Sequence, residues 1–155
     1  MEMQLDDLDE FRVKDILAMY DFETDAMVWI KDRELRYRWA NRTFLLNFSF
    51  PNISHLFGKT DREFTPAFLA DLYCNDDRKV LAGSTIVARV EPVGTLEAIA
   101  SWNQTWKRPI CNKRGKILGA MGLSRRLPNT TAPDFPFPDL LPVLEHIRLV
   151  SRLWH

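Results

Sequence analysis

The chain of 155 residues has only two cysteines, Cys74 and Cys111. Two thiols are too few for the disulfide scaffold of a small secreted domain, so we expect a cytoplasmic protein with reduced thiols. No apolar run approaches the length that crosses a bilayer, and the acidic opening segment MEMQLDDLDE lacks the basic and then apolar order of a signal peptide. The sequence therefore predicts no contact with a membrane.

The chain also lacks a net charge, because 21 basic residues balance 21 acidic ones. A domain that binds nucleic acid is normally basic, so the balance argues against one. The charges are unevenly spread: residues 1–26 hold nine acids and two bases, whereas residues 98–133 hold no acid and seven bases, namely Lys107, Arg108, Lys113, Arg114, Lys116, Arg125 and Arg126. We interpret both stretches as solvated faces that complement each other within the fold or across a dimer, with no direct nucleic-acid contact.

Motifs for catalysis and for metal binding are missing as well. There is no Gly-x-Ser-x-Gly elbow, no phosphate-binding loop and no Cys/His group with metal-ligand spacing. Asp76 and Asp77 are adjacent on a predicted helix and therefore point in different directions, so we expect solvated helix charges rather than a catalytic pair. The sequence predicts a protein that is not an enzyme and holds no metal.

What the chain does have is apolar bulk and regular patterning. Hydrophobic residues make up 46% of it, with ten Phe and five Trp, enough for one core. A helix is predicted over residues 7–20, where Val13, Ile16, Leu17 and Tyr20 follow helical spacing. Its apolar stripe is the nearest candidate to cover Trp29 on the following strand.

Strand and helix signals then follow one another in a recognisable order. Alternation predicts strands at residues 27–31, 36–40, 86–90, 98–110 and 116–124. Asn41 is suited to cap a short helix, Thr60 and Glu63 have capping-box spacing, and a longer helix runs from about Pro66 to Leu81. Five largely antiparallel strands with helices grouped in the middle predict the α+β class.

The composition divides the chain into three parts. Residues 1–24 hold the N-terminal amphipathic flanking helix, and residues 25–127 hold the domain. Residues 128–155 hold the proline-rich segment PNTTAPDFPFPD, which is typical of a linker, and a predicted last helix at about 139–154.

Several segments taken together resemble a PAS domain of the PAS-4-like sensor type. They are VWIKDRELRYRWANRTF, LFGKTDREFTP, the acidic pair at 76–77 and TWKRPICNKRGKILGAMGLSRRL. The resemblance implies a five-stranded antiparallel sheet with short helices over one face, a small ligand between them, and dimerisation through the preceding helix. It departs from the family at Arg125-Arg126-Leu127, where many members have an Asp-Ile-Thr triplet that anchors the outgoing linker.

The resemblance leaves the cofactor unknown but disfavours two of them. Haem would need an axial His in the helix over residues 66–82, which has none. A covalent flavin would need a cysteine in a different context from the LYCNDD around Cys74. We therefore expect neither haem nor covalent flavin.

A partial ligand pocket is the candidate binding site. Its six predicted lining residues are apolar and come from the helices and strands that the fold would bring together: Phe44, Phe68, Leu72, Ile86, Trp102 and Met121. The five tryptophans can equally well serve as core or as an interface.

The expected function is that of a sensory, ligand-binding and dimerisation module. The ending LLPVLEHIRLVSRLWH resembles the helix that opens an AraC-type DNA-binding region or the linker to a LuxR-type one, so a bacterial transcription regulator is the expected context. Two alternatives stay open. A ligand-free interaction module would have no cavity, and a small enzyme would have a buried Asp, Glu or His with a perturbed pKa facing a cavity.

Overall fold

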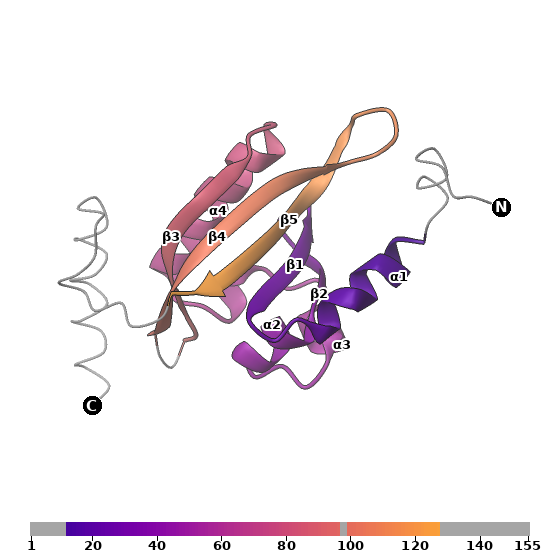
Figure 1. The fold of residues 1–155 in the computed structure, drawn as a ribbon. Coiled ribbons are helices and arrows are strands. Elements are labelled where there is room, and N and C mark those ends of the chain that lie inside the picture. Colours follow the sequence, from indigo (N-terminus) through magenta and orange to yellow (C-terminus); the bar gives the residue numbers. More distant parts are fainter. Residues whose placement is uncertain (1–11, 97–98, 128–155) are drawn as a thin grey trace.

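The computed structural model describes residues 12–96 and 99–127. Its centre is one five-stranded antiparallel sheet in the order β2-β1-β5-β4-β3, as Figure 1 shows. The strands are β1 (Ala26–Asp32), β2 (Tyr37–Ala40), β3 (Ile86–Gly94), β4 (Ile99–Cys111) and β5 (Ile117–Arg126). The predicted α+β class and the PAS-like arrangement of five antiparallel strands are confirmed.

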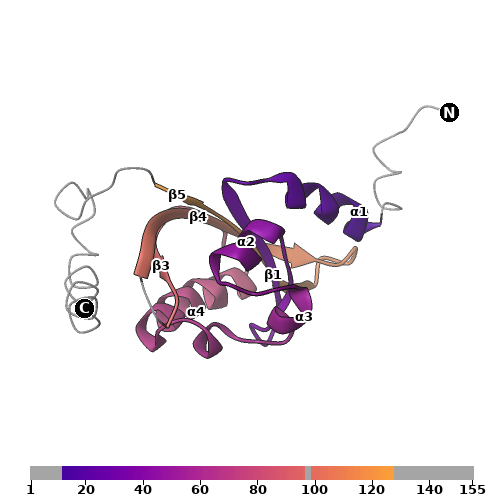
Figure 2. The ribbon, with the colours of Figure 1, turned by 90° about the horizontal axis from the view of Figure 1, so that it is seen from below.

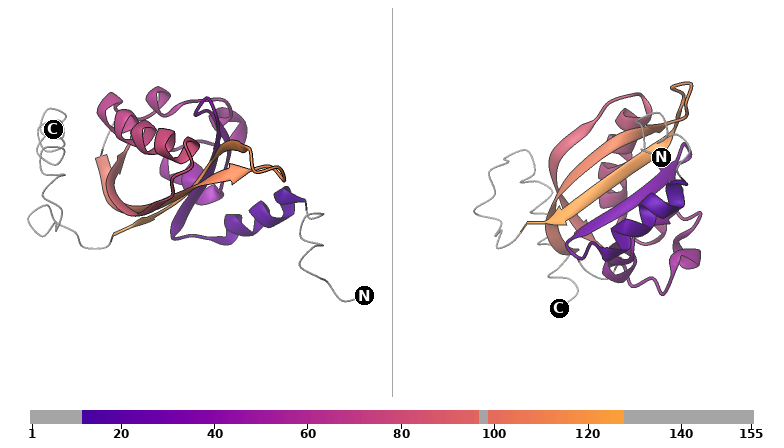
Figure 3. Two further views of the ribbon diagram at one scale, coloured as in Figure 1. Left: turned by 90° about the horizontal axis from the view of Figure 1, so that it is seen from above. Right: turned by 45° about the vertical axis from the view of Figure 1, so that its right-hand side comes forward.

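Helices lie on both faces of this curved sheet (Figures 2 and 3). The concave inner face is covered by α2 (Arg42–Asn47), α3 (Ile53–Leu56), the 3-10 helix η3 (Asp61–Glu63) and α4 (Ala67–Leu81). The opposite, outer face carries only α1 (Val13–Ala18) and the 3-10 helix η2 (Met19–Phe22). Residues 12–96 and 99–127 therefore leave most of the outer face without a covering layer of their own.

Asn41 shows why the chain turns from strand to helix after β2. Its buried side-chain oxygen accepts hydrogen bonds from the backbone N–H of Phe44, at 3.1 Å, and of Val28, at 3.0 Å. Its Nδ2 donates to the carbonyls of Tyr20 and Ala26, both at 2.9 Å. The predicted cap of α2 is confirmed, and the same amide also joins η2 and β1 to it.

The predicted capping box at Thr60 and Glu63 is present, and it caps the N-terminus of the short η3 helix. The long helix α4 begins after Pro66 and ends at Leu81, as predicted. Gly83 follows with a φ of 107°, a left-handed backbone conformation that glycine adopts without strain. This arrangement places Asp61 on η3 opposite the inner face of β1.

The N-terminal flanking helix differs from its prediction. Helical structure begins at Val13, and α1 has no buried residue. Trp29 points to the inner face, where its ring lies 5.8 Å from that of Phe44, so the expected cover of Trp29 by this helix is wrong. On the outer face it is Val28 that meets Tyr20 in one groove. The predicted cap at residues 7–10 and the predicted helix at 139–154 lie outside the described residues.

Candidate functional site

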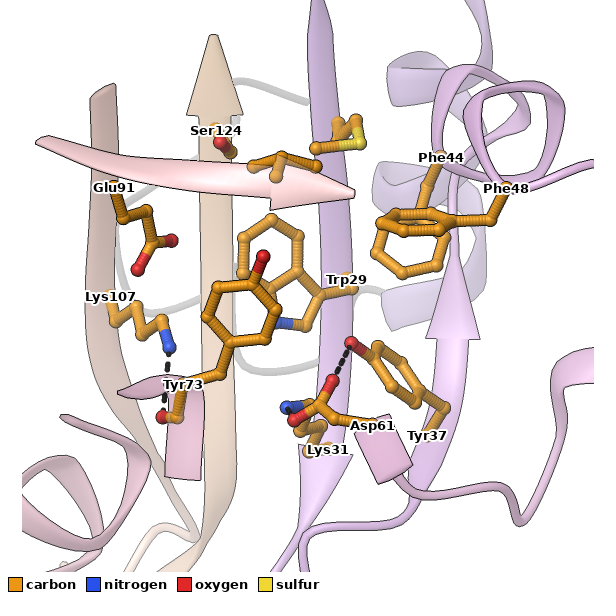
Figure 4. A pocket seen from close by; sticks show the side chains of 12 residues that line it. Trp29, Lys31, Tyr37, Phe44, Phe48, Asp61, Tyr73, Glu91, Lys107 and Ser124 are labelled. Carbon is orange, nitrogen blue, oxygen red and sulfur yellow. Dashed lines mark hydrogen bonds and ion pairs between the residues drawn. The ribbon is translucent and has the colours of Figure 1, made fainter. Parts of the chain in front are cut away.

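A small cavity lies between the inner face of the sheet and the helices (Figure 4). Its volume is about 30 Å³, room for about two water molecules. Strands β1–β5 and helices α2, η3 and α4 all contribute to its wall. The lining residues are Met27, Trp29, Lys31, Tyr37, Phe44, Phe48, Asp61, Tyr73, Glu91, Val93, Lys107 and Ser124.

Aromatic rings form one side of this cavity. The Phe44 ring lies 5.2 Å from that of Tyr37 and 4.8 Å from that of Phe48, in the tilted arrangements that aromatic pairs prefer. The Trp29 indole lies against β5 at Gly122, where a Cβ atom would overlap its ring. The absence of a side chain at Gly122 therefore lets the indole lie flat on the sheet and keeps the cavity open.

Charged side chains form the other side. The Lys31 ammonium on β1 lies 2.5 Å from the Asp61 carboxylate and 2.7 Å from that of Asp77. The Lys107 ammonium on β4 lies 2.6 Å from the second oxygen of Asp77, and the Tyr37 hydroxyl donates to Asp61 at 2.6 Å. All four charged side chains are at most 2% exposed, so they form a continuous buried ionic cluster.

Mutual attraction in this cluster favours the charged forms of Lys31 and Asp77. Burial by itself lowers the pKa of Lys31, but Asp61 and Asp77 outweigh it and raise that pKa well above its usual value. Burial likewise raises the pKa of Asp77, yet Lys31 and Lys107 together hold it below the usual range. The cluster thus pairs two lysines with two aspartates in the interior of the fold.

Glu91 on β3 adds a third carboxyl group to the same interior. Burial raises the pKa of Glu91, and the opposing effects of Lys107 and of a hydrogen bond with Thr105 do not cancel it. Thr105 Oγ1 lies 2.9 Å from Ser124 Oγ, which also accepts a hydrogen bond from Asn103 at 2.9 Å. A line of hydroxyl groups therefore runs from Glu91 along β4 and β5.

The hydroxyl line leads to a second, polar groove of about 400 Å³ at one end of the sheet. Met27 and Ser124 line both this groove and the cavity. The unbranched Met27 side chain has three rotatable bonds and adapts readily to a change in shape. The remaining groove residues are Thr24, Asp25, Thr43, Asn47, Ser101, Asn103 and Arg126.

A third hollow, of about 280 Å³, lies on the outer face of the sheet and is almost entirely apolar. Its lining includes Tyr20, Val28, Ile86, Trp106, Met121 and Leu123. The short helices on this face present apolar side chains to solvent, with exposed fractions of 63% for Val13, 49% for Ile16, 66% for Met19 and 80% for Phe22. None of the described residues buries these four side chains.

The six predicted pocket residues do not gather in one place. Phe44 lines the inner cavity, whereas Met121 lines the outer groove. Ile86 borders that groove, but it is buried in a small core cluster with Val80 of α4 and Ala120. Phe68, Leu72 and Trp102 line neither of these nor the polar groove, and Trp102 shares the outer face of β4 with Trp106 by strand alternation. Ligand contact by these residues stays a prediction.

The charged interior is what reasoning from the sequence missed. Asp77 is completely buried and Asp76 is 7% exposed, where it pairs with Arg89 at 2.9 Å, so the solvated interpretation of both acids is wrong. Their side chains do point in different directions, as expected. Lys107 is also buried rather than part of a solvated basic face. The signal that was available is the alternation of Asn103, Thr105 and Lys107 on one face of a strand.

Two absences hold for residues 12–96 and 99–127, the described part of the chain. No helix there is long and apolar enough to span a bilayer. No group of three or more His, Cys, Asp or Glu side chains there is arranged to hold a metal ion.

Comparisons with known proteins agree with this architecture. The PAS-4 family model, described as a PAS fold, matches residues 22–130. Two solved structures of VqmA, one bound to DPO and one of the Vibrio cholerae dimer described among LuxR-type receptors, are each 18% identical, with TM-scores of 0.63 and 0.64. They match 75% and 81% of this chain, which spans only 58% and 61% of theirs.

A third neighbour is the PAS domain of Bordetella pertussis BvgS, which is 16% identical with a TM-score of 0.52 and covers 88% of this chain and 97% of its own. No curated protein matches the sequence itself at a significant level.

Proposed function

The chain belongs to the PAS-4 family of PAS folds, and on this premise we propose that it is a cytoplasmic sensory module that binds a small molecule in the cavity behind its sheet. PAS domains are typically sensors, and the solved structures similar to this chain include VqmA bound to DPO. The proposed action is binding and not catalysis.

The observation that carries this proposal is the construction of the cavity. Ligand sites are concave and mostly apolar, with a few fixed polar groups that orient the ligand. Here the Trp29, Phe44 and Tyr73 rings supply the apolar wall. Glu91 and Lys107 supply polar groups whose positions are held by the surrounding strands. Movement of Met27 would join the cavity to the polar groove and admit a ligand larger than two water molecules.

We further propose that the signal leaves through a homodimer. Apolar side chains of α1 and η2 lie beside the apolar outer groove, and a second copy of the chain would cover both. A ligand would shift the dimer only if it bound two arrangements of sheet and flanking helix with different affinity. Asn41 bonds η2, β1 and α2 together and so connects the cavity wall to that helix.

The output we propose is regulation of transcription through an attached or partner effector, with no direct nucleic-acid contact by this chain. VqmA is described among LuxR-type receptors. This chain spans about six tenths of the VqmA chains, so the effector is part of the proposal.

The enzyme alternative is favoured by one specific observation, since Glu91 is a buried acid of raised pKa that faces a cavity. Against it, both lysines of the cavity are already paired with aspartates, so neither ammonium is free to polarise a substrate. A ligand-free interaction module is the second alternative, and the cavity argues against it.

The test is ligand binding by the full chain of 155 residues. DPO and a panel of small heterocycles would be titrated while the melting temperature and the Trp29 indole N–H resonance are followed. We expect saturable binding by at least one compound, abolished in Gly122→Ala, in which the added Cβ pushes the indole into the cavity, and retained in the outer-face variant Met121→Ala. A chain that dimerises yet binds no compound would favour the ligand-free module.

A further inference from the structure

The buried ionic cluster and Glu91 together place one more acid than base around the cavity. Asp61, Asp77 and Glu91 supply three carboxyl groups, whereas Lys31 and Lys107 supply two ammonium groups. The two aspartates and the two lysines pair with one another in three ion pairs of 2.5 to 2.7 Å. Glu91 is therefore the carboxyl group that the protein's own cations leave over.

The position of Glu91 makes this surplus available to a ligand. Its side chain lines the cavity from β3 and projects toward the space between Lys107 and the Tyr73 ring, as Figure 4 shows. Lys107 is the cation that acts on it most strongly, but that ammonium is 2.6 Å from Asp77 and 3.3 Å from the Tyr73 carbonyl oxygen. A buried carboxylate without its own counter-ion is costly, and a cation placed beside it would remove that cost.

The opposite wall also suits a positive charge. The faces of aromatic rings attract cations, and the cavity already shows this with Lys31 lying 4.8 Å from the centre of the Tyr37 ring and Lys107 lying 5.9 Å from that of Tyr73. Trp29, an indole and so the ring type that attracts cations most strongly, has no cation over its face among the described residues. An anionic ligand would instead meet the unbalanced carboxyl group.

We propose that the ligand of this cavity is a small organic base, an amine or a nitrogen heterocycle, that binds as its cation with the protonated nitrogen against the Glu91 carboxylate. This inference rests on the proposed function. When a neutral base enters, the Glu91 O–H bond breaks and a ligand N–H bond forms, so one proton moves within the site and none is lost. When the ligand enters already protonated, Glu91 gives its proton to solvent, and Thr105 and Ser124 lead it toward the polar groove.

Imidazole and pyrazole provide a matched pair of probes, because the two rings have the same size and differ chiefly in basicity. Acetate serves as the anionic probe. Each would be titrated at neutral pH into the full chain, with the Trp29 indole N–H resonance reporting on the cavity. We expect imidazole to bind at least about tenfold more tightly than pyrazole, as a charge-assisted hydrogen bond implies, and acetate not to bind.

The Glu91→Gln variant removes the charge and keeps the shape, so in this variant the preference for imidazole over pyrazole is expected to fall to about twofold or less. Glu34→Gln, an exposed acid in the β1–β2 turn, is the matched control and should keep the full preference. Should Glu91→Gln fail to fold, the relative affinities of the wild-type protein for imidazole, pyrazole and acetate test the inference without the variant.

Equal affinity for the two rings, tighter binding of acetate, or an unchanged preference in Glu91→Gln would each overturn the inference. So would a failure of all three probes in a protein that binds another small molecule, and the proposed sensory function would then stand. Failure of the probes together with the entire panel above would overturn both.

Discussion

Strand β4 presents opposite chemistry on the two faces of the sheet. Its inner face carries Thr105 and Lys107, both buried, whereas Trp106 on its outer face lines an open apolar groove. In most antiparallel sheets the apolar residues face the core and the polar residues face water. Here the charges are inside because the buried cluster pairs them, and the tryptophan is outside, half-buried in an open groove.

The difference suggests that the inner face binds the ligand and the outer face binds a partner. The inner face is closed by ion pairs in which each member depends on the others, so its geometry is fixed and suited to selecting one ligand. The outer face has an open apolar groove beside the exposed apolar side chains of α1 and η2, and apolar surface of this kind is suited to an exchangeable partner. Changes on the inner face are therefore expected to alter folding, and changes on the outer face to alter association.

The largest effect is expected from removal of Asp77. In Asp77→Ala, both Lys31 and Lys107 lose a buried partner, at 2.7 Å and 2.6 Å respectively. Breaking a buried ion pair by removing one member costs about 3–5 kcal/mol, because an uncompensated charge stays in the interior. Urea denaturation followed by circular dichroism would measure it.

The control for that variant is on the exposed side of the same helix. Asp71 pairs with Arg62, and both side chains are more than half exposed. Since surface pairs contribute only about 0–1 kcal/mol, Asp71→Ala should leave the unfolding free energy nearly unchanged. Equal losses in the two variants would mean that the inner cluster does not stabilise the fold.

The next effect is expected from Gly122→Ala. The added Cβ would overlap the Trp29 indole and force it off the sheet, and overpacking of this kind typically costs about 1–3 kcal/mol. Trp29 would then occupy the cavity, so a changed near-ultraviolet circular dichroism spectrum should accompany the lower melting temperature. Met121→Ala on the outer face should leave that spectrum unchanged. A wild-type spectrum in Gly122→Ala would show that the position of the Trp29 indole does not require glycine at residue 122.

The sequence was sufficient to predict the framework and not the chemistry inside it. Period-two alternation predicted all five strands, and cap chemistry at Asn41 and the stop at Leu81 predicted helix ends, because these features depend on neighbouring residues only. The cavity depends on which face of β4 turns inward. The tryptophans suggested the face with Trp102, and that choice placed the predicted pocket partly on the wrong side of the sheet.

The ionic cluster could not be predicted from any local pattern. Lys31, Asp61 and Asp77 are separated by 30 and 46 residues along the chain, and each taken alone is typical of a solvated charge. Only the register of β1 beside β5 and the approach of α4 bring them together. A charged side chain is buried only where partners from other segments pair with it, and the residue spacing within one segment does not reveal those partners.

A smaller effect, dependent on pH, is expected at Glu91. Burial raises the pKa of this group in the folded protein, so the folded state binds its proton more tightly than the unfolded state. Its contribution to stability is therefore complete below the ordinary glutamate pKa and decreases as the pH rises through the folded pKa. Glu91→Gln should lose this dependence and gain stability relative to wild type as the pH rises above the ordinary glutamate pKa.

Urea titrations of both proteins at several pH values would measure that difference, with Glu34→Gln as the exposed control. Asp77 gives the opposite sign, since its lowered pKa contributes stability that is lost only as the pH falls through it. A constant difference between wild type and Glu91→Gln across this range would contradict the buried protonated acid.

The smallest effect on folding is expected on the outer face, at Ile16. This side chain is 49% exposed on α1 and buries little within one chain, so Ile16→Asp should change the unfolding free energy of the monomer by no more than about 0.5 kcal/mol. A charge in an apolar interface between two copies is costly, so sedimentation should show a dimer for wild type and a monomer for the variant. Leu46→Asp, on α2 across the sheet and 67% exposed, should remain dimeric. A dimer that survives Ile16→Asp would place the interface elsewhere and remove the assignment of association to the outer face.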